Sequence, residues 1–217
     1  SANDPADAPV AVEVADIDAD GTLEIAFANR GDARLFNSVR FLNLGPLGQS
    51  ELIDSQIAPV PLPRDRVITD LAVLRADPSQ RTARGVASPT LILLSDTALD
   101  GTVTAATFDV PANDWETCDI DVCDDPDSVD PIDMDGLVAS LGTGFASTSF
   151  EDDKVVVASN TGGMPDTFPT QTFAVGADPG ELTSGDLNGD GFPDVVVANV
   201  TGGTVSLLAN IADAGSP

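Results

Sequence analysis

The chain has 217 residues, of which 36 are acidic and 9 basic, giving a formal net charge of −27. It therefore lacks the basic surface that binds nucleic acid or an anionic membrane. The absence of histidine excludes Ser-His-Asp catalysis, Cys-His catalysis and histidine-containing zinc sites. A hydrophobic content of 42% is too high for a disordered acidic chain. No apolar run reaches the roughly 20 residues of a membrane-spanning helix.

The N-terminal residues 1–9 are rich in Ala, Asp and Pro and are predicted to form a lead-in segment. The chain begins with serine and carries no signal peptide, so we expect a processed secreted protein or a segment cut from a longer one. Residues 10–15 alternate weakly between apolar and polar side chains, as a strand does.

An acidic loop follows at 16–24, with the sequence Asp-Ile-Asp-Ala-Asp-Gly-Thr-Leu-Glu. Alternate residues of a tight loop point inward, so oxygen ligands at positions 1, 3, 5 and 9 converge on one hard cation such as Ca²⁺. Position 7 offers its backbone carbonyl, and Gly21 at position 6 permits the sharp turn. The predicted metal ligands of this first loop are Asp16, Asp18, Asp20, Thr22 through its carbonyl, and Glu24.

Residues 10–60 are predicted to form a first four-stranded unit, and residues 61–112 a second. In the second unit, the segment between the first two expected strands contains one acidic residue, Asp77. It also contains Arg81 and Arg84, which would repel a cation. We therefore expect no metal in the second unit.

Residues 113–130 are predicted to form an acidic insertion that contains the two cysteines, Cys118 and Cys123. In an exported protein a local disulfide is the expected state of this pair, and a free pair is the alternative. Acidic residues cluster over 119–127. Two interpretations stay open for them: a further Ca²⁺ site, or a solvated loop held by the disulfide.

The third unit, 131–176, has a weaker acidic pattern, and its candidate ligands are Asp130, Asp133 and Asp135. Pro131 would occupy position 1 of this loop and offers no side-chain oxygen. The third loop is therefore a vestige, or it takes ligands from elsewhere. The strands expected in this unit lie at 137–141, 154–159 and 170–175.

The fourth unit, 177–210, repeats the pattern of the first loop over 186–194, with Asp186 in the place of Asp16. A second match in which every loop position keeps the same spacing indicates an internal repeat. Its β-branched run Val195–Ala198 predicts a strand where an EF-hand would have a helix. A third strand is expected at 204–210, and 211–217 form a tail. The predicted ligands are Asp186, Asn188, Asp190, Phe192 through its carbonyl, and Asp194.

Residues 173–199 and 203–210 closely resemble a VCBS or FG-GAP repeat, the repeat of integrin-α-type β-propellers. The resemblance implies four-stranded blades, each with Ca²⁺ between its first two strands. The expected fold is therefore all-β, a propeller-like array of about four four-stranded blades with calcium loops. Propellers of this family have roughly seven blades, so we expect part of a longer protein, a short propeller or an open array.

The two loops, the lack of a catalytic constellation and the resemblance predict a calcium-stabilised, non-enzymatic extracellular module for adhesion or surface interaction. Ca²⁺ is its expected cofactor. Its expected partner is a protein or glycan at a cell surface, or a copy of itself joined by strand addition, with no nucleic acid and no membrane insertion. The alternatives are a self-assembling subunit of an extracellular filament or surface layer, and a carbohydrate-active propeller enzyme.

The last unit lacks an obvious fourth strand, so 204–210 should present an open sheet edge. Either residues 10–14 of the same chain or a strand of a neighbouring molecule is expected to pair with it.

Overall fold

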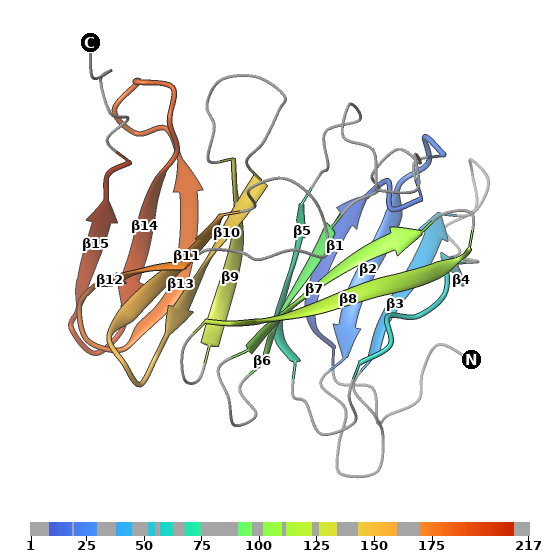
Figure 1. The fold of residues 1–217 in the computed structure, drawn as a ribbon, viewed down its shortest axis with the longest axis horizontal. Coiled ribbons are helices and arrows are strands. Elements are labelled where there is room, and N and C mark those ends of the chain that lie inside the picture. The colour runs from blue at the N-terminus through green and yellow to red at the C-terminus, as the bar shows by residue number, and fades with distance from the viewer. Residues whose placement is uncertain are drawn as a thin grey trace.

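The computed structural model describes residues 9–18, 20–29, 38–44, 52–54, 57–62, 68–74, 91–96, 102–109, 112–122, 126–133, 143–159 and 170–210. These residues form fifteen strands in four antiparallel sheets and no helix (Figure 1). The expected all-β class is confirmed. None of them belongs to a helix that could cross a membrane.

Each sheet is a meander in which consecutive strands are paired. Sheet 1 contains β1 (Pro9–Ala15), β2 (Glu24–Asn29), β3 (Ser38–Leu44) and β4 (Leu52–Asp54). Sheet 2 contains β5 (Ile68–Leu74), β6 (Leu91–Asp96), β7 (Thr102–Asp109) and β8 (Asp114–Asp121). Sheet 3 contains β9 (Pro126–Asp133), β10 (Thr143–Ser149), β11 (Lys154–Ser159) and β12 (Thr170–Ala174). Sheet 4 contains β13 (Pro179–Gly185), β14 (Asp194–Asn199) and β15 (Thr204–Leu208).

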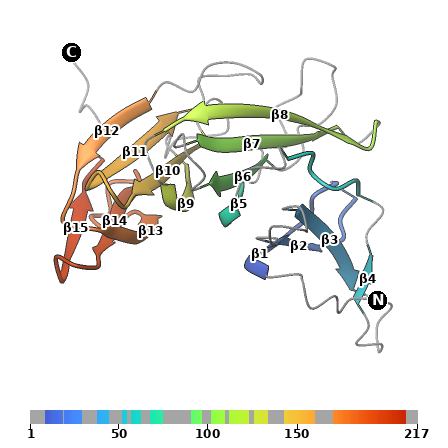
Figure 2. The same cartoon turned by 90° about the horizontal axis from the view of Figure 1, so that it is seen from below.

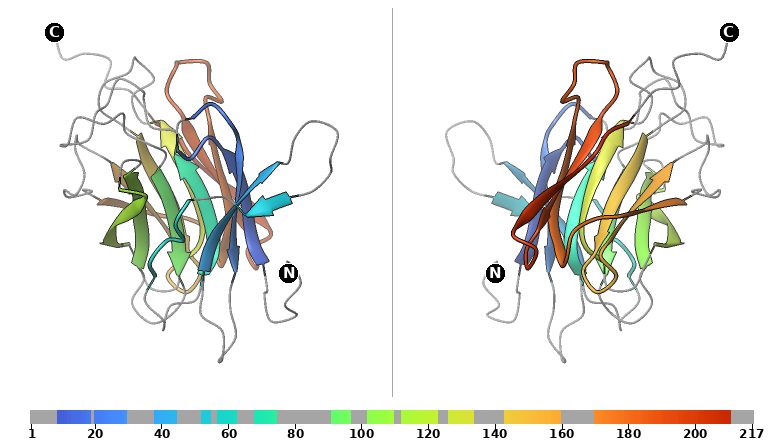
Figure 3. Two further views of the ribbon diagram at one scale, coloured as in Figure 1. Left: turned by 90° about the vertical axis from the view of Figure 1, so that its right-hand side faces the viewer. Right: turned by 90° about the vertical axis from the view of Figure 1, so that its left-hand side faces the viewer.

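The four sheets lie side by side along an arc, with sheets 1 and 4 at its two ends (Figure 2). The first strands of the sheets are neighbours: β1 lies against β5, β5 against β9, and β9 against β13. Figure 3 looks onto the two ends of the arc in turn. The described residues form no closed ring of sheets.

The hydrophobic core is divided into three clusters, one between each pair of neighbouring sheets. Along β7, Val103 and Ala105 pack toward sheet 3 while Ala106 and Phe108 pack toward sheet 1. Sheets 2 and 3 therefore bury both faces, which explains unbroken apolar runs such as 155–158, where all four side chains are buried.

The segment expected to be an acidic insertion forms strands instead: β8 is the fourth strand of sheet 2, and β9 is the first of sheet 3. The Trp115 indole donates a hydrogen bond to the Ala58 carbonyl (2.7 Å) and packs against the rings of Phe41 and Phe108. Asp119 is exposed on the outer strand and accepts a hydrogen bond from the Thr104 hydroxyl (2.9 Å). Asp119 and Asp121 thus lie in the edge strand β8 and Asp127 lies in β9, whereas Asp124 and Asp125 lie outside the described residues.

Sheet 3 also differs from expectation, because its second strand is β10 and not 137–141, which lies outside the described residues. Cys123 lies outside them too, so the disulfide with Cys118 stays a prediction. β10 contains Ser147, Thr148 and Ser149, whose side chains are all buried. Small polar side chains of this kind gave no apolar signal in the sequence.

Within the described chain, sheet 4 has three strands and β15 is its edge, as the sequence suggested. Ring closure by residues 10–14 is wrong, because β1 pairs with β2 as the first strand of sheet 1 and lies against β5. Strand addition from a neighbouring molecule stays a prediction.

Candidate metal centre

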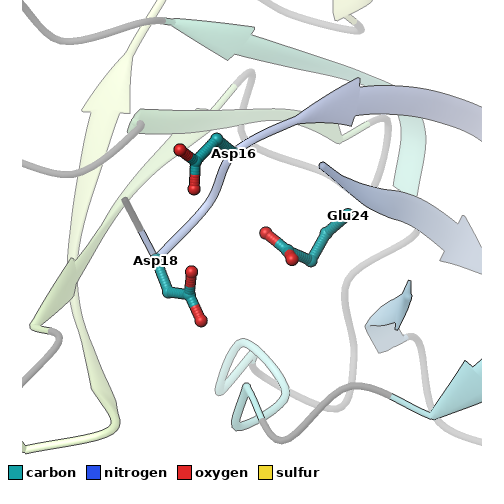
Figure 4. A group of neighbouring side chains, drawn as sticks. All are labelled: Asp16, Asp18 and Glu24. Carbon is teal, nitrogen blue, oxygen red and sulfur yellow. The ribbon is translucent and has the colours of Figure 1, made fainter. Parts of the chain in front are cut away.

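The first acidic loop connects β1 to β2 and gathers three carboxylates. Asp16 and Asp18 are half-buried in the loop, and Glu24, the first residue of β2, is fully buried. One carboxylate oxygen from each of the three lies within 4.8 Å of the others. Figure 4 shows the three side chains gathered around one space. Among the described residues, no other group of three or more such side chains comes this close.

Backbone N–H groups hold these carboxylates in place. Asp16 accepts from the N–H of Asp20 at Oδ1 (3.0 Å) and from that of Gly21 at Oδ2 (2.9 Å). Glu24 accepts from the N–H of Ile17 at Oε2 (2.9 Å). Each carboxylate oxygen has two lone pairs, so an oxygen that accepts a hydrogen bond can also coordinate a metal ion. Gly21 adopts φ +89°, a conformation that only glycine takes up without strain.

Burial makes the negative charge of this loop unfavourable in the absence of a cation. The pKa of Glu24 is raised above its usual 4.5, first by burial and then by repulsion from Asp18, Asp20 and Asp16, against a lowering hydrogen bond from Ile17. The pKa of Asp18 is likewise raised, by burial and by the charge of Asp20. A divalent cation among these groups would reverse the repulsion and favour the ionised forms.

The loop between β13 and β14 repeats this scaffold at the equivalent positions of the fourth unit. The N–H of Leu187 donates to Asp194 Oδ2 (3.1 Å), as Ile17 does to Glu24. The N–H groups of Asp190 and Gly191 donate to Asp186 Oδ1 (3.2 Å) and Oδ2 (2.9 Å). Gly191 also adopts φ +89°. Because so many contacts recur, the two loops share one backbone design.

The two loops differ at position 3, where the first has Asp18 and the fourth has Asn188. Both oxygens accept from the N–H at position 5, at 3.2 Å for Asp18 and 2.8 Å for Asn188. The amide nitrogen of Asn188 donates to Asp190 Oδ2 (2.9 Å). Carboxylate and amide oxygens both suit Ca²⁺, so the fourth loop keeps the donor type with one negative charge fewer.

The carbonyl ligands predicted at position 7 remain predictions. The N–H groups of Thr22 and Phe192 donate to Oδ1 of the acidic residue two positions earlier, Asp20 (2.7 Å) and Asp190 (2.9 Å). These hydrogen bonds show that Thr22 and Phe192 lie within the two loops, as expected.

The weaker candidates of the third unit have a different setting. Asp130 and Asp133 lie in β9, and Asp135 lies outside the described residues. Asp130 Oδ2 accepts from the N–H of Ser184 (2.8 Å) and so joins β9 to β13. Asp70 does the same one sheet earlier, accepting from the N–H of Val129 (3.0 Å). The segment of the second unit expected to be metal-free, 76–85, lies outside the described residues.

The sequence-based prediction missed a buried asparagine at the end of β14 that is opposite the fourth loop. Asn199 accepts from the N–H of Gly176 (3.1 Å) and donates to the hydroxyls of Thr204 and Ser206 (both 3.0 Å). The internal repeat provides the missed signal, because it pairs Asn199 with Asn29, which is also buried at the end of β2.

The family model of the FG-GAP repeat matches residues 179–208. The match begins at the first residue of β13 and ends at the last of β15, so it covers sheet 4 and the fourth loop. Residues 179–208 are thus an FG-GAP repeat, a unit of β-propeller-type modules that is typical of extracellular and cell-surface proteins. No curated protein matches the chain.

Proposed function

We propose that this chain is a calcium-stabilised, non-enzymatic extracellular module that acts in adhesion or surface interaction. The observation that carries the proposal is the pair of loops with one hydrogen-bond scaffold, in the first of which Asp16, Asp18 and Glu24 converge. The FG-GAP match supports the extracellular setting and the blade-type architecture.

The ion's role is structural. Bound at the first loop, Ca²⁺ would neutralise buried carboxylates and fix the connection from β1 to β2. At the fourth loop it would fix β13 to β14. β1 lies against β5 and β13 lies against β9, the first strands of the neighbouring sheets. Rigid loops after β1 and β13 would therefore hold sheets 1 and 4 in position against sheets 2 and 3. A rigid scaffold of this kind presents its outer surface for recognition.

Two observations support binding rather than catalysis. Asp70 and Asp130 lie in first strands, and their carboxylates accept hydrogen bonds from the backbone of the next sheet, which assigns them a structural task. A pocket between sheets 3 and 4 has an apolar and amide lining without a titratable side chain. It is lined by Ile132, Val157, Gln171, Phe173, Pro193, Val195, Leu208, Ala209 and Asn210.

Isothermal titration with Ca²⁺ tests the proposal. The wild type should bind two ions, and Asp20→Ala/Asp190→Ala should lose both binding events. Glu151→Ala removes an exposed carboxylate outside the loops and is the matched control, which should still bind two. An unchanged stoichiometry in the double variant would contradict the assignment. Turnover in a glycan hydrolysis screen would contradict the non-enzymatic role.

A further inference from the structure

The two end sheets each expose apolar side chains on one face. On sheet 1 these belong to β1 and include Val10, Val12 and Val14. On sheet 4 they include Val205 and Leu207 of β15. In each inner sheet, described residues of both faces contribute to the core clusters.

The internal repeat relates every position of sheet 4 to one of sheet 1. Strands β13 and β14 match β1 and β2 at the same spacing as the loops, and the strand pairing matches too, since Val12 pairs with Phe27 as Leu182 pairs with Val197. The third strands are aligned through their first cross-strand pairs. Ser38 of β3 pairs with Asn29, and Thr204 of β15 pairs with Asn199, the equivalent of Asn29. Phe41 of β3 therefore corresponds to Leu207 of β15.

The open face of sheet 1 corresponds to the buried face of sheet 4. Val12 is 64% exposed, whereas its equivalent Leu182 is 5% exposed and packs against sheet 3. Ile25 and Phe27 of β2 are only half-buried, whereas their equivalents in β14, Val195 and Val197, are buried in the same cluster. Sheet 1 thus has the face that would receive a preceding sheet.

The open face of sheet 4 corresponds in turn to the buried face of sheet 1. Leu207 is 58% exposed, whereas its equivalent Phe41 is 4% exposed and packs against sheet 2. Leu187 is 60% exposed, whereas its equivalent Ile17 is fully buried in that cluster. Sheet 4 thus has the face that would receive a following sheet.

We propose that the open face of sheet 4 packs on the open face of sheet 1 of a second copy of this chain, in a head-to-tail arrangement. The contact continues the series of sheet-on-sheet interfaces that already joins sheets 1 to 4, and it brings Leu207 and Leu187 toward Val12 and Val14. The interface is heterologous, so repetition gives a ring if the rotation closes and a filament if it does not. It uses sheet faces together with Leu187 of the fourth loop, so it requires no strand addition.

The test measures the mass of the full chain in Ca²⁺ by light scattering over a wide concentration range, at low and high salt. The wild type should reach at least twice the mass of one chain as concentration rises. High salt should favour association, because it screens the repulsion between two chains of net charge −27. A wild type that stays monomeric throughout would overturn the proposal.

Two variants separate the faces. Leu207→Arg blocks the face of sheet 4, and Val12→Arg blocks that of sheet 1. Both side chains are exposed, so the fold should persist, which circular dichroism checks. Each variant alone should be monomeric, whereas an equimolar mixture should form dimers through the one intact face that each contributes. Phe150→Arg alters an exposed side chain in the β10–β11 turn and should associate as the wild type does.

The mixture distinguishes head-to-tail packing from its competitors. If either variant alone still dimerises, a face pairs with its own copy and the head-to-tail contact is wrong. If the mixture of folded variants stays monomeric, the two faces are not complementary. If all variants associate as the wild type does, the contact lies elsewhere on the molecule. Each of these results overturns the inference.

Discussion

The first and fourth loops share their hydrogen bonds and differ in charge. In both, the position-1 aspartate accepts from the backbone N–H groups of positions 5 and 6, and a glycine at φ +89° makes the turn. The first loop has four carboxylates over positions 1 to 9, and the fourth has three, since Asn188 replaces Asp18. The backbone scaffold therefore stays the same when one negative charge is lost, so two loops of one fold can differ in their affinity for a cation.

Calcium removal should have the largest effect. A ligand that binds only the folded state stabilises it by roughly 2.7 kcal/mol per site at a hundredfold excess over Kd. Without the ion, repulsion among the loop carboxylates lowers the stability of the folded state further, and more so in the first loop than in the fourth. Calorimetry with Ca²⁺ and with chelator measures the shift in melting temperature. A melting temperature that the chelator leaves unmoved at both low and high salt would refute the structural role of the ion.

The charge difference at position 3 can be exchanged between the two loops by single substitutions. Asp18→Asn should give the first loop the charge of the fourth and weaken its Ca²⁺ binding by about tenfold, or about 1.4 kcal/mol. Asn188→Asp should strengthen binding at the fourth loop by a similar factor. Titration of each substitution in a chain whose other loop is disabled by Asp20→Ala or Asp190→Ala isolates the two sites. Affinities that respond in the same direction would show that charge does not set the difference.

The shared turn can be broken at Gly191. A Cβ at this position would meet no atom within 4 Å, so Gly191→Ala changes backbone strain alone. Alanine at positive φ costs roughly 1–2 kcal/mol. Gly185→Ala is the matched control, because its Cβ also meets nothing and no positive φ is required. Denaturant unfolding should show the loss for Gly191→Ala only, and equal losses in the two variants would contradict the strain argument.

The smallest expected effect is the pH response of the calcium-free first loop. Because burial raises the pKa of Glu24 in the folded state, the ionised group destabilises the fold. That penalty grows as pH rises through the folded pKa and is absent below the unfolded value near 4.5. With chelator at pH 7, Glu24→Gln should therefore unfold at higher denaturant than wild type, and the gap should close as pH falls. A gap that widens on acidification would reverse the sign and exclude the burial argument.

The sequence predicted the parts of this fold that depend on local chemistry. The loop spacing located both acidic loops, and apolar β-branched runs located strands such as β11 and β14. It failed where tertiary context decides. β8 is acidic because it lies at a sheet edge, and β9 contains Pro126 and Pro131, which argue against a strand in isolation.

Burial in the candidate site was equally hidden from the sequence. Glu24 and Asp194 occupy the same loop position and are both buried at the start of a second strand. Their spacing predicted that they are ligands. Only the folded structure shows that both carboxylate side chains are buried. The open faces of these sheets could not be predicted from the sequence either, because an apolar strand has the same residue pattern whether or not a neighbouring sheet covers it.

A crystal structure of the chain grown in Ca²⁺ would show directly whether the two loops bind the ion. One ion should lie in each loop, with oxygens of Asp16, Asp18, Asp20 and Glu24, and of their fourth-loop counterparts, at about 2.3–2.6 Å. Anomalous scattering would identify the element. Water in both loops at saturating Ca²⁺, with the carboxylates held only by the backbone N–H groups, would contradict this prediction.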